Sequence, residues 1–230
     1  MVIQTFSGTV VEQKMLTADV LFLSLAIPET FSFNAGQFVT IKITQSGVTR
    51  LKSYSIFNPP TPRGKLDFCI KIIDGGFASE EFKRTKRGDS FELKGPFGHF
   101  LFDEKNTSSE YWFLGAGTGV APLYSMLAEY VPKLPQQKFV LLFGVREQKN
   151  LFYDDILKML AKKNPNFTYV PILSCAQWSG KQGHVQDHLP EDVSGKMFYV
   201  CGLKELVLET KELLVQKGVA LDRIKSERYD

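Results

Sequence analysis

The 230-residue sequence has few cysteines and no long hydrophobic run. Its three cysteines, Cys69, Cys175 and Cys201, are odd in number and far apart, which argues against a disulfide framework and a cysteine-rich iron–sulfur site. No apolar stretch approaches the ~18 residues that a membrane span requires. The N-terminus also lacks the basic and then apolar layout of a signal peptide. These absences predict a cytoplasmic protein with reduced thiols and no membrane span.

Net charge and histidine content favour neither nucleic acid nor a metal ion as a ligand. The formal net charge of +3 is too small to predict nucleic-acid binding. His184 and His188 are four residues apart, but without a third ligand nearby we predict no metal site. With 23% charged and 43% hydrophobic residues, the chain has the composition of a globular protein. Its length suits one large domain or two of ordinary size.

The first hundred residues alternate between apolar and polar side chains, as strands with one buried face do. The alternation is clearest at Val39, Ile41 and Ile43. Similar patterns, separated by turns rich in glycine and proline, occupy residues 21–27, 66–72 and 91–93. Several strands at this spacing predict an antiparallel barrel or sandwich, interrupted by one short helix near residues 78–84.

Beyond a polar stretch between Gly98 and Glu110, the pattern changes to apolar runs that show little alternation. Such runs, typical of strands covered on both faces, occupy residues 139–143, 167–173 and 197–201. Helical periodicities lie between and after them, at residues 153–161 and 203–214. Strands that alternate with helices predict a parallel sheet. We therefore predict a two-domain β + α/β protein, with an antiparallel β-barrel over residues 1–100 and a parallel-sheet α/β domain over residues 101–230.

The stretch from Tyr111 to Pro122 combines an apolar strand, a glycine turn and the start of a helix. Apolar side chains from Val120 to Val131 follow a 3.6-residue period, and Pro122 suits the first helical turn. A helix N-terminus after a glycine turn offers backbone N–H groups to a pyrophosphate, which predicts nucleotide binding. An ordinary strand-to-helix turn explains the stretch equally well, because the pattern reads G-x-G-x-x-P instead of G-x-G-x-x-G.

Six short motifs, in order along the chain, resemble those of the ferredoxin–NADP reductase family. They are Lys52-Ser-Tyr54-Ser55, Gly75-Gly-Phe-Ala-Ser79, Gly95-Pro-Phe-Gly98, Gly115-Ala-Gly-Thr-Gly-Val-Ala-Pro122, Cys201-Gly202 and Glu227-Arg-Tyr229. The match runs over nearly the whole chain. The resemblance implies a flavin-binding barrel, a nicotinamide-nucleotide domain and FAD held between them.

The resemblance places the FAD site on the first domain. It implies that Lys52 neutralises a flavin phosphate, that Tyr54 lies against the isoalloxazine and that Ser55 reaches toward flavin N5. The family usually has arginine at the position of Lys52, and lysine lacks the bidentate fork, so looser flavin retention is expected. Arg50, on the same strand face, is a second candidate cation. The other implied FAD contacts are Ile70 and Lys71 for the ring and ribityl chain, and the helix start at Gly76, Phe77, Ala78 and Ser79 for the pyrophosphate.

The same resemblance places NAD(P)H, as substrate, on the second domain. Gly117, Thr118 and Gly119 would cradle its pyrophosphate. Cys201 and Gly202 match the position beside the nicotinamide C4. A cysteine after an apolar strand is more often a small buried side chain than a functional thiol, so we assign Cys201 a positioning role instead of a covalent one.

The sequence also bears on the choice between NADPH and NADH. In relatives that prefer NADPH, a serine and an arginine grip the 2′-phosphate. Here Ser174 is present, but Cys175 stands where the arginine would be. Arg146 and Lys181 remain as cations that could substitute, which predicts only a modest preference for NADPH.

Glu227 and Tyr229 complete the set assigned to catalysis, with Ser55 and Cys201. Plant-type relatives cover the flavin with a Glu-x-Tyr ending. By this resemblance, Tyr229 would cover the flavin and would have to move aside for nicotinamide. The alternative is that residues 227–230 form a disordered tail. The resemblance implies hydride transfer from NAD(P)H to flavin N5, followed by electron delivery to a ferredoxin- or flavodoxin-type protein. We expect the protein to be a monomer. The alternatives are an NAD(P)H:flavin reductase that uses flavin as a diffusible substrate, and a redox or nucleotide sensor with little turnover.

Overall fold

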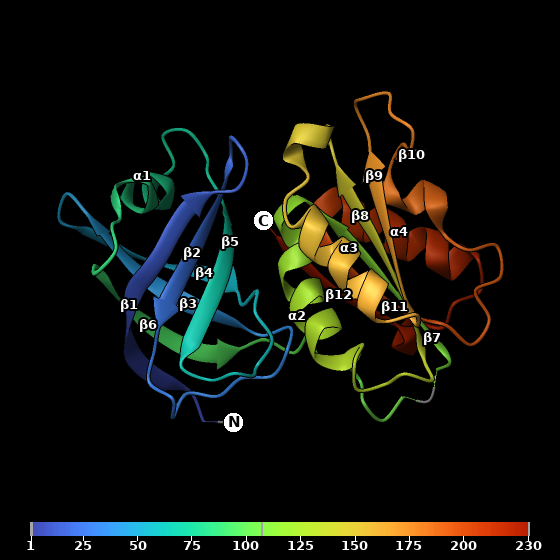
Figure 1. Ribbon diagram of the computed structural model, residues 1–230, viewed down its shortest axis with the longest axis horizontal. Coiled ribbons are helices and arrows are strands. Elements are labelled where there is room, and N and C mark those ends of the chain that lie inside the picture. The colour runs from blue at the N-terminus through green and yellow to red at the C-terminus, as the bar shows by residue number, and fades with distance from the viewer. Residues whose placement is uncertain (1, 107, 230) are drawn as a thin grey trace.

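The computed structural model describes residues 2–106 and 108–229, which form two domains that lie next to each other (Figure 1). The first domain is an antiparallel six-stranded sheet curled into a half-barrel, as predicted. Its order is β4-β3-β6-β1-β2-β5, which leaves β4 and β5 at the two edges. In chain order the elements are β1 (Gln4–Met15), β2 (Val20–Ala26), β3 (Phe38–Gln45), β4 (Val48–Ser55), β5 (Lys65–Lys71), α1 (Phe77–Arg84) and β6 (Ser90–Phe97).

The half-barrel is held by the apolar residues whose alternation predicts strands. Leu23, Val39, Ile41 and Phe68 are all completely buried on its inner face. Each such side chain contributes about 1.5–3 kcal/mol when it is removed from water. The alternation did not predict β1 or β4. In β4 nearly every side chain is exposed, so this strand carries no apolar face for a pattern to report.

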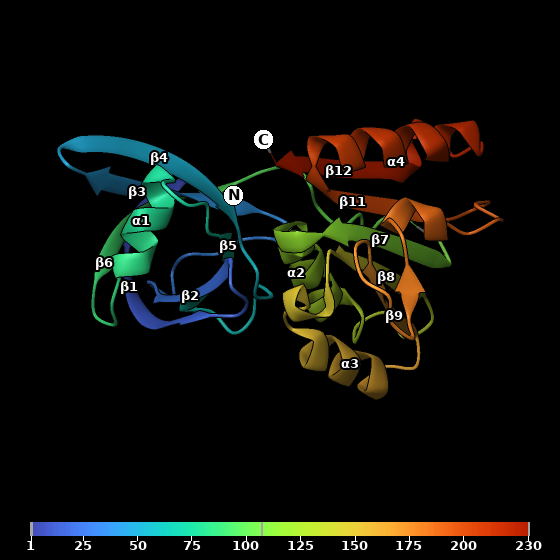
Figure 2. The same cartoon turned by 90° about the horizontal axis from the view of Figure 1, so that it is seen from above.

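The second domain is a parallel sheet with the order β10-β9-β8-β7-β11-β12. Helices α2 and α3 pack on one face and α4 on the other (Figure 2). The strands are β7 (Glu110–Ala116), β8 (Lys138–Val145), β9 (Phe167–Leu173), β10 (Lys181–Gln182), β11 (Met197–Leu203) and β12 (Ile224–Tyr229). The helices are α2 (Val120–Tyr130), α3 (Asp154–Lys163) and α4 (Lys204–Gln216), with short 3₁₀ turns η1 (Gly117–Gly119), η2 (Gln148–Asn150), η3 (Val185–His188) and η4 (Leu221–Arg223).

The predicted parallel α/β domain is thus confirmed, while β10 and β12 were not predicted from apolar runs. Strand β7 lies between β8 and β11, so the strand order reverses at β7. In open parallel sheets, ligands bind outside the carboxyl ends of the strands at such a reversal. The glycine turn η1 follows directly after β7 and lies at that point. Among the residues described, no helix has the length and hydropathy of a membrane span.

The two domains pack directly against each other. The ring of Phe57, from the first domain, stacks on Tyr124 of α2 with the ring centroids 4.4 Å apart. The Ser125 hydroxyl donates a hydrogen bond to the carbonyl oxygen of Asn58 at 2.8 Å. Gly36 also lies in this seam, because a Cβ there would lie 2.4 Å from the Met126 side chain of α2. These contacts hold the carboxyl ends of the parallel strands against the half-barrel.

Candidate functional site

A cleft of about 620 Å³ opens at the carboxyl ends of the parallel strands. Residues of both domains line it. From the first domain come Asp19, Val20 and Lys71; from the second come Ala116, Gly117, Thr118, Gly144, Val145, Arg146, Asn150, Phe152, Ser174, Gly183, His184, Val185, Gln186, Gly202, Leu203, Glu205, Leu206, Glu209 and Tyr229. The cleft therefore lies where the strand order predicts a ligand, and it reaches the first domain.

The glycine turn forms one wall of this cleft. Gly117 has a φ of +52°, in the left-handed region that other residues rarely adopt. A Cβ at Gly119 would lie 2.4 Å from the carbonyl oxygen of Cys201, so only glycine lets the turn pack against β11. Helix α2 begins at Val120, directly after the turn, and its N-terminal N–H groups are available to an anion. The turn thus has the geometry of the predicted pyrophosphate cradle.

Four residues predicted to be catalytic come together where the two domains meet. The Tyr229 hydroxyl donates to Ser55 Oγ at 2.9 Å, and Ser55 Oγ donates to Glu227 Oε2 at 3.3 Å. Strand β12 pairs in parallel with β11, which places Glu227 opposite Cys201. Ser55 ends β4 in the first domain, and the other three residues belong to the second domain. The cluster is therefore a point of contact between the domains.

Burial controls the protonation of this cluster. It raises the pKa of the Glu227 carboxyl to about 7, and the hydrogen bond from Ser55 opposes that rise. Burial, with the nearby Glu227 charge, raises the pKa of the Cys201 thiol. Burial also raises the pKa of the Tyr229 hydroxyl. At neutral pH Cys201 is accordingly a protonated thiol, which suits a positioning role better than nucleophilic attack, while Glu227 can gain or lose a proton.

The predicted FAD contacts on β4 share the inward face of the half-barrel. Lys52 and Tyr54 lie opposite Ile41 and Val39 of β3, two completely buried residues. Tyr54 packs edge-on against Phe82, with the ring centroids 5.4 Å apart. Lys52 is exposed on the same face. A polar ligand phosphate could reach Lys52 without displacing any part of the protein core.

The turn before α1 is built as the predicted pyrophosphate site requires. Gly75 has a φ of +69°, and a Cβ at Gly76 would lie 2.9 Å from the carbonyl oxygen of Ile73. The buried Ser79 hydroxyl accepts a hydrogen bond from the N–H of Ile73 at 3.0 Å, which closes the turn. A hydroxyl can accept and donate at once, so its predicted role as a phosphate donor is compatible with this contact. Phe77 and Ala78 form the first turn of α1. These residues fit an FAD pyrophosphate.

Ile70 and Lys71 end β5, an edge strand of the half-barrel. An edge strand presents unpaired N–H and C=O groups along its outer side, which suits the predicted backbone contacts to flavin. Ile70 is buried, and the Lys71 ammonium forms an ion pair with Asp19 at the cleft. That ion pair lowers the pKa of Asp19. Asp19 belongs to no motif, and sequence reasoning did not identify it.

Not every residue predicted to bind the nucleotide lies in the cleft. Arg146 and Ser174 line it, at the ends of β8 and β9. The side chain of Lys181, in β10, is exposed and is not among the lining residues, although its carbonyl accepts a hydrogen bond from Trp178. The sequence did not identify Asn150 or the other lining residues of the loops after β8 and β9. These loops have no recognisable motif, and only the folded sheet brings them together.

The paired histidines are used in turn structure. His184 precedes η3, and the His188 ring contacts the carbonyl oxygen of Gln182 at 2.8 Å. Across residues 2–106 and 108–229, no three His, Cys, Asp or Glu side chains form a group that could hold a metal ion.

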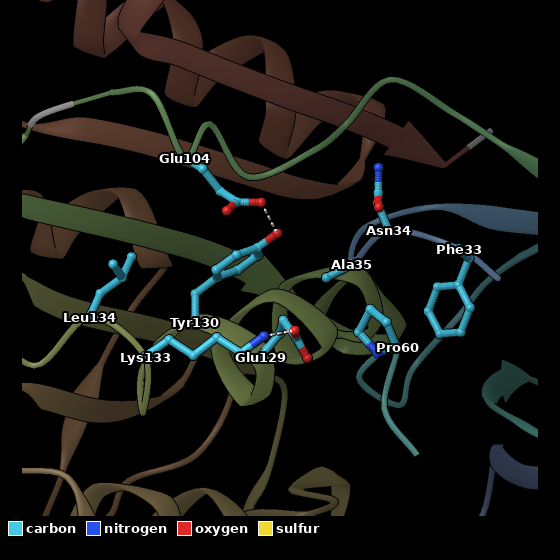
Figure 3. Close-up of a pocket in the computed structure, with 9 residues that line it drawn as sticks. All are labelled: Phe33, Asn34, Ala35, Pro60, Glu104, Glu129, Tyr130, Lys133 and Leu134. Carbon is cyan, nitrogen blue, oxygen red and sulfur yellow. Dashed lines mark hydrogen bonds and ion pairs between the residues drawn. The ribbon is translucent and has the colours of Figure 1, made fainter. Parts of the chain in front are cut away.

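A second, smaller pocket of about 260 Å³ lies at another part of the domain seam (Figure 3). Its charged side chains and its tyrosine hydroxyl are already paired. Tyr130 donates to Glu104 at 2.9 Å, and Lys133 forms an ion pair with Glu129. The lining residues are Phe33, Asn34, Ala35, Pro60, Glu104, Glu129, Tyr130, Lys133 and Leu134, none of which lines the larger cleft. We therefore place the functional site in the larger cleft and at the Ser55 cluster.

Comparison with known proteins identifies the family of each domain. Residues 7–102 match the model of the oxidoreductase FAD-binding domain, and residues 113–212 match that of the oxidoreductase NAD-binding domain. The chain is 31% identical over 214 residues to ferredoxin–NADP reductase B of Sorangium cellulosum, covering 88% of this chain and 87% of that protein. It is 28% identical over 231 residues to the xylene/toluene monooxygenase electron transfer component of Pseudomonas putida, covering 97% of this chain but only 65% of that protein.

The solved structures include a close match in fold. The cytochrome P450 reductase GcoB of Amycolatopsis aligns with a TM-score of 0.91 and 26% sequence identity. The alignment covers 98% of this chain and 70% of that one. The chain thus spans under two thirds of the Pseudomonas relative, and a larger share of GcoB and of the Sorangium protein.

Proposed function

The chain belongs to the ferredoxin–NADP reductase family, and from this premise we propose that it is an FAD-dependent oxidoreductase that takes hydride from NAD(P)H and passes electrons to a small redox protein. The observation that supports this most strongly is the contact of Ser55 with Glu227 and Tyr229. It joins the FAD-binding and NAD-binding domains at one point, and hydride transfer requires the two rings to meet at such a point.

The chain's residues bind and orient the reactants. FAD, when bound, supplies the redox chemistry by accepting hydride and releasing electrons. Lys52 and the start of α1 would hold its phosphates, and Tyr54 would contact its ring. The glycine turn holds the nucleotide pyrophosphate, and the Cys201 thiol limits where nicotinamide can lie. Because the pKa of Glu227 lies at about 7, this carboxyl can hold or release a proton beside Ser55 Oγ in the working pH range.

Tyr229 controls access to this point in the proposed cycle. Its side chain lines the cleft while its hydroxyl is bound to Ser55. A nicotinamide ring bound beside Cys201 would require the Tyr229 ring to move aside. That movement would break the side-chain hydrogen bonds of Tyr229 to Ser55 and Cys201.

For the nucleotide, we propose a modest preference for NADPH. Arg146 and Ser174 line the same cleft, and together they offer a cation and a hydroxyl to a 2′-phosphate. The ratio of kcat/KM for NADPH and NADH tests this. A large preference for NADH would mean that Arg146 does not face the ribose.

The first experiment is to purify the protein and identify its flavin. We expect a yellow protein with FAD near one per chain that reduces an artificial dye with NAD(P)H. Reduction of a ferredoxin and of a flavodoxin, compared side by side, then tests the acceptor. A colourless protein with saturation kinetics in added flavin would instead identify an NAD(P)H:flavin reductase. A protein that binds nucleotide but reduces no acceptor would indicate a sensor.

A further inference from the structure

Arg50 lies on the strand face that the predicted flavin residues occupy. In the β3–β4 pair, Arg50 is opposite Ile43, as Lys52 is opposite Ile41. Both isoleucines are completely buried, so Arg50 and Lys52 project from the inward face of the half-barrel. Both cations are exposed there. This chain has lysine at position 52, where the family motif has arginine, but it carries an arginine two residues earlier on the same face.

The Arg50 side chain is directed toward the start of α1. Its guanidinium carbon lies 4.6 Å from the centroid of the Phe77 ring, a cation–π contact. Phe77 is the first residue of α1 and follows the Gly75-Gly76 turn. A guanidinium here lies close to the unpaired N–H groups of the helix N-terminus, and both favour an anion. No comparable contact brings Lys52 to α1 among the interactions of the described residues.

The direction of β4 orders the two cations along a bound FAD. Ser55 ends β4 at the contact with the second domain, and Lys52 and Arg50 lie progressively farther from that end. Alternate residues of a strand are about 6.6–6.8 Å apart. In FAD the phosphate of the flavin-mononucleotide half follows the ring and ribityl chain, and the phosphate of the adenosine half comes next. Lys52, which is nearer to the end of β4, therefore suits the flavin-side phosphate. Arg50, which is farther from that end, suits the adenosine-side phosphate.

We propose that Arg50 binds the adenosine-side phosphate of FAD, and that Lys52 binds only the flavin-side phosphate. This inference rests on the proposed binding of FAD between the domains. Arginine can hold a phosphate through two parallel N–H donors, which lysine cannot. Arg50 thus compensates for the lysine at position 52 and makes the site selective for FAD over FMN, because FMN lacks the second phosphate.

The test compares the dissociation constants of FAD and FMN. The full-length protein is stripped of flavin and titrated with each flavin, and binding is followed by flavin fluorescence. R50A should weaken FAD binding by about 10-fold to 100-fold, the usual worth of a charge-assisted hydrogen bond, and should change FMN binding less than about twofold. K52A should weaken the binding of both flavins. K94A, which removes an exposed cation from β6, should weaken neither.

Two further variants keep the test independent of folding. R50K retains the charge but not the fork, and should weaken FAD binding about threefold to tenfold. In the R50A background, K52R restores a fork at the family position and should recover part of the lost FAD affinity. The inference is overturned if R50A binds FAD as wild type does, or if R50A loses FMN and FAD affinity equally. Wild-type protein that binds no FAD would instead overturn the proposed function.

Discussion

Replacing Glu227 by glutamine should remove a pH dependence from the stability of the protein. Burial at the domain junction raises the pKa of this carboxyl from 4.5 to about 7. The folded chain thus binds the proton more tightly than the unfolded chain between these values. The free energy of unfolding of the wild type therefore falls as the pH rises from about 4.5 through about 7, and this loss is complete above that range.

The size of the effect follows from the pKa shift. A rise from 4.5 to about 7 corresponds to about 3 kcal/mol across the whole titration, as an upper bound, at about 1.4 kcal/mol per pKa unit. Glutamine has nearly the same shape, can accept the Ser55 hydrogen bond and does not ionise. In a chain of this size each kcal/mol shifts Tm by about 2–4 °C. Between pH 5 and pH 8 the melting temperature of wild type should therefore fall by several degrees relative to that of E227Q.

The assay is thermal melting of wild type, E227Q and E191Q, loaded with flavin, across this pH range. Glu191 is exposed, so E191Q makes the same chemical substitution without the burial. If the wild-type and E227Q curves run parallel from pH 5 to pH 8, Glu227 does not titrate near neutrality and the reasoning fails. The pH profile of kcat/KM provides a second readout, in which E227Q should lose an inflection near pH 7.

Three further changes test the cleft. Tyr229→Ser should leave the fold intact and tighten nicotinamide binding. The measurement is a titration with oxidised nucleotide in which flavin absorbance is followed. Coinciding curves for mutant and wild type would contradict this expectation. Gly119→Ala should weaken nucleotide binding by at least about tenfold, since its Cβ would lie 2.4 Å from the Cys201 carbonyl oxygen; wild-type affinity would show that this packing is dispensable. Cys175→Arg, beside Ser174, should raise the NADPH to NADH ratio of kcat/KM by about tenfold, and an unchanged ratio would place the 2′-phosphate elsewhere.

The apolar pattern predicted a strand only where one face of that strand packs against the protein core. Val39, Ile41 and Ile43 point into a protein core, and the alternation predicted β3. Strand β4 carries Arg50 and Lys52 on the corresponding face, where both side chains are exposed. An apolar pattern reports burial against protein only, so β4 was missed. The family motif at Lys52-Ser-Tyr54-Ser55 pointed to this segment instead, because it matches residue types rather than an apolar pattern.

The sequence predicted candidate residues for the site but not the contacts between them. Ser55 and Tyr229 are 174 residues apart, and no local pattern relates them. The raised pKa of Glu227 arises from burial between two domains, which depends on how they pack. Asp19 and Asn150 reach the cleft from loops without motifs. The resemblance predicted Ser55, Glu227 and Tyr229 as candidate site residues, while their contacts and burial required the folded chain.

The Tyr229 side chain can move without unfolding the protein because it lies at the end of an edge strand. Strands β4 and β12 are both edge strands, and Ser55 and Tyr229 are the last residues of each. Moving the Tyr229 ring would therefore break its side-chain hydrogen bonds to Ser55 and Cys201, worth about 1–3 kcal/mol together, and would leave the backbone pairing of each sheet intact. A nucleotide bound at micromolar affinity gains about 8 kcal/mol, several times that cost. The nucleotide itself can thus drive Tyr229 aside, whereas a tyrosine in a central strand could not move without disrupting its neighbours.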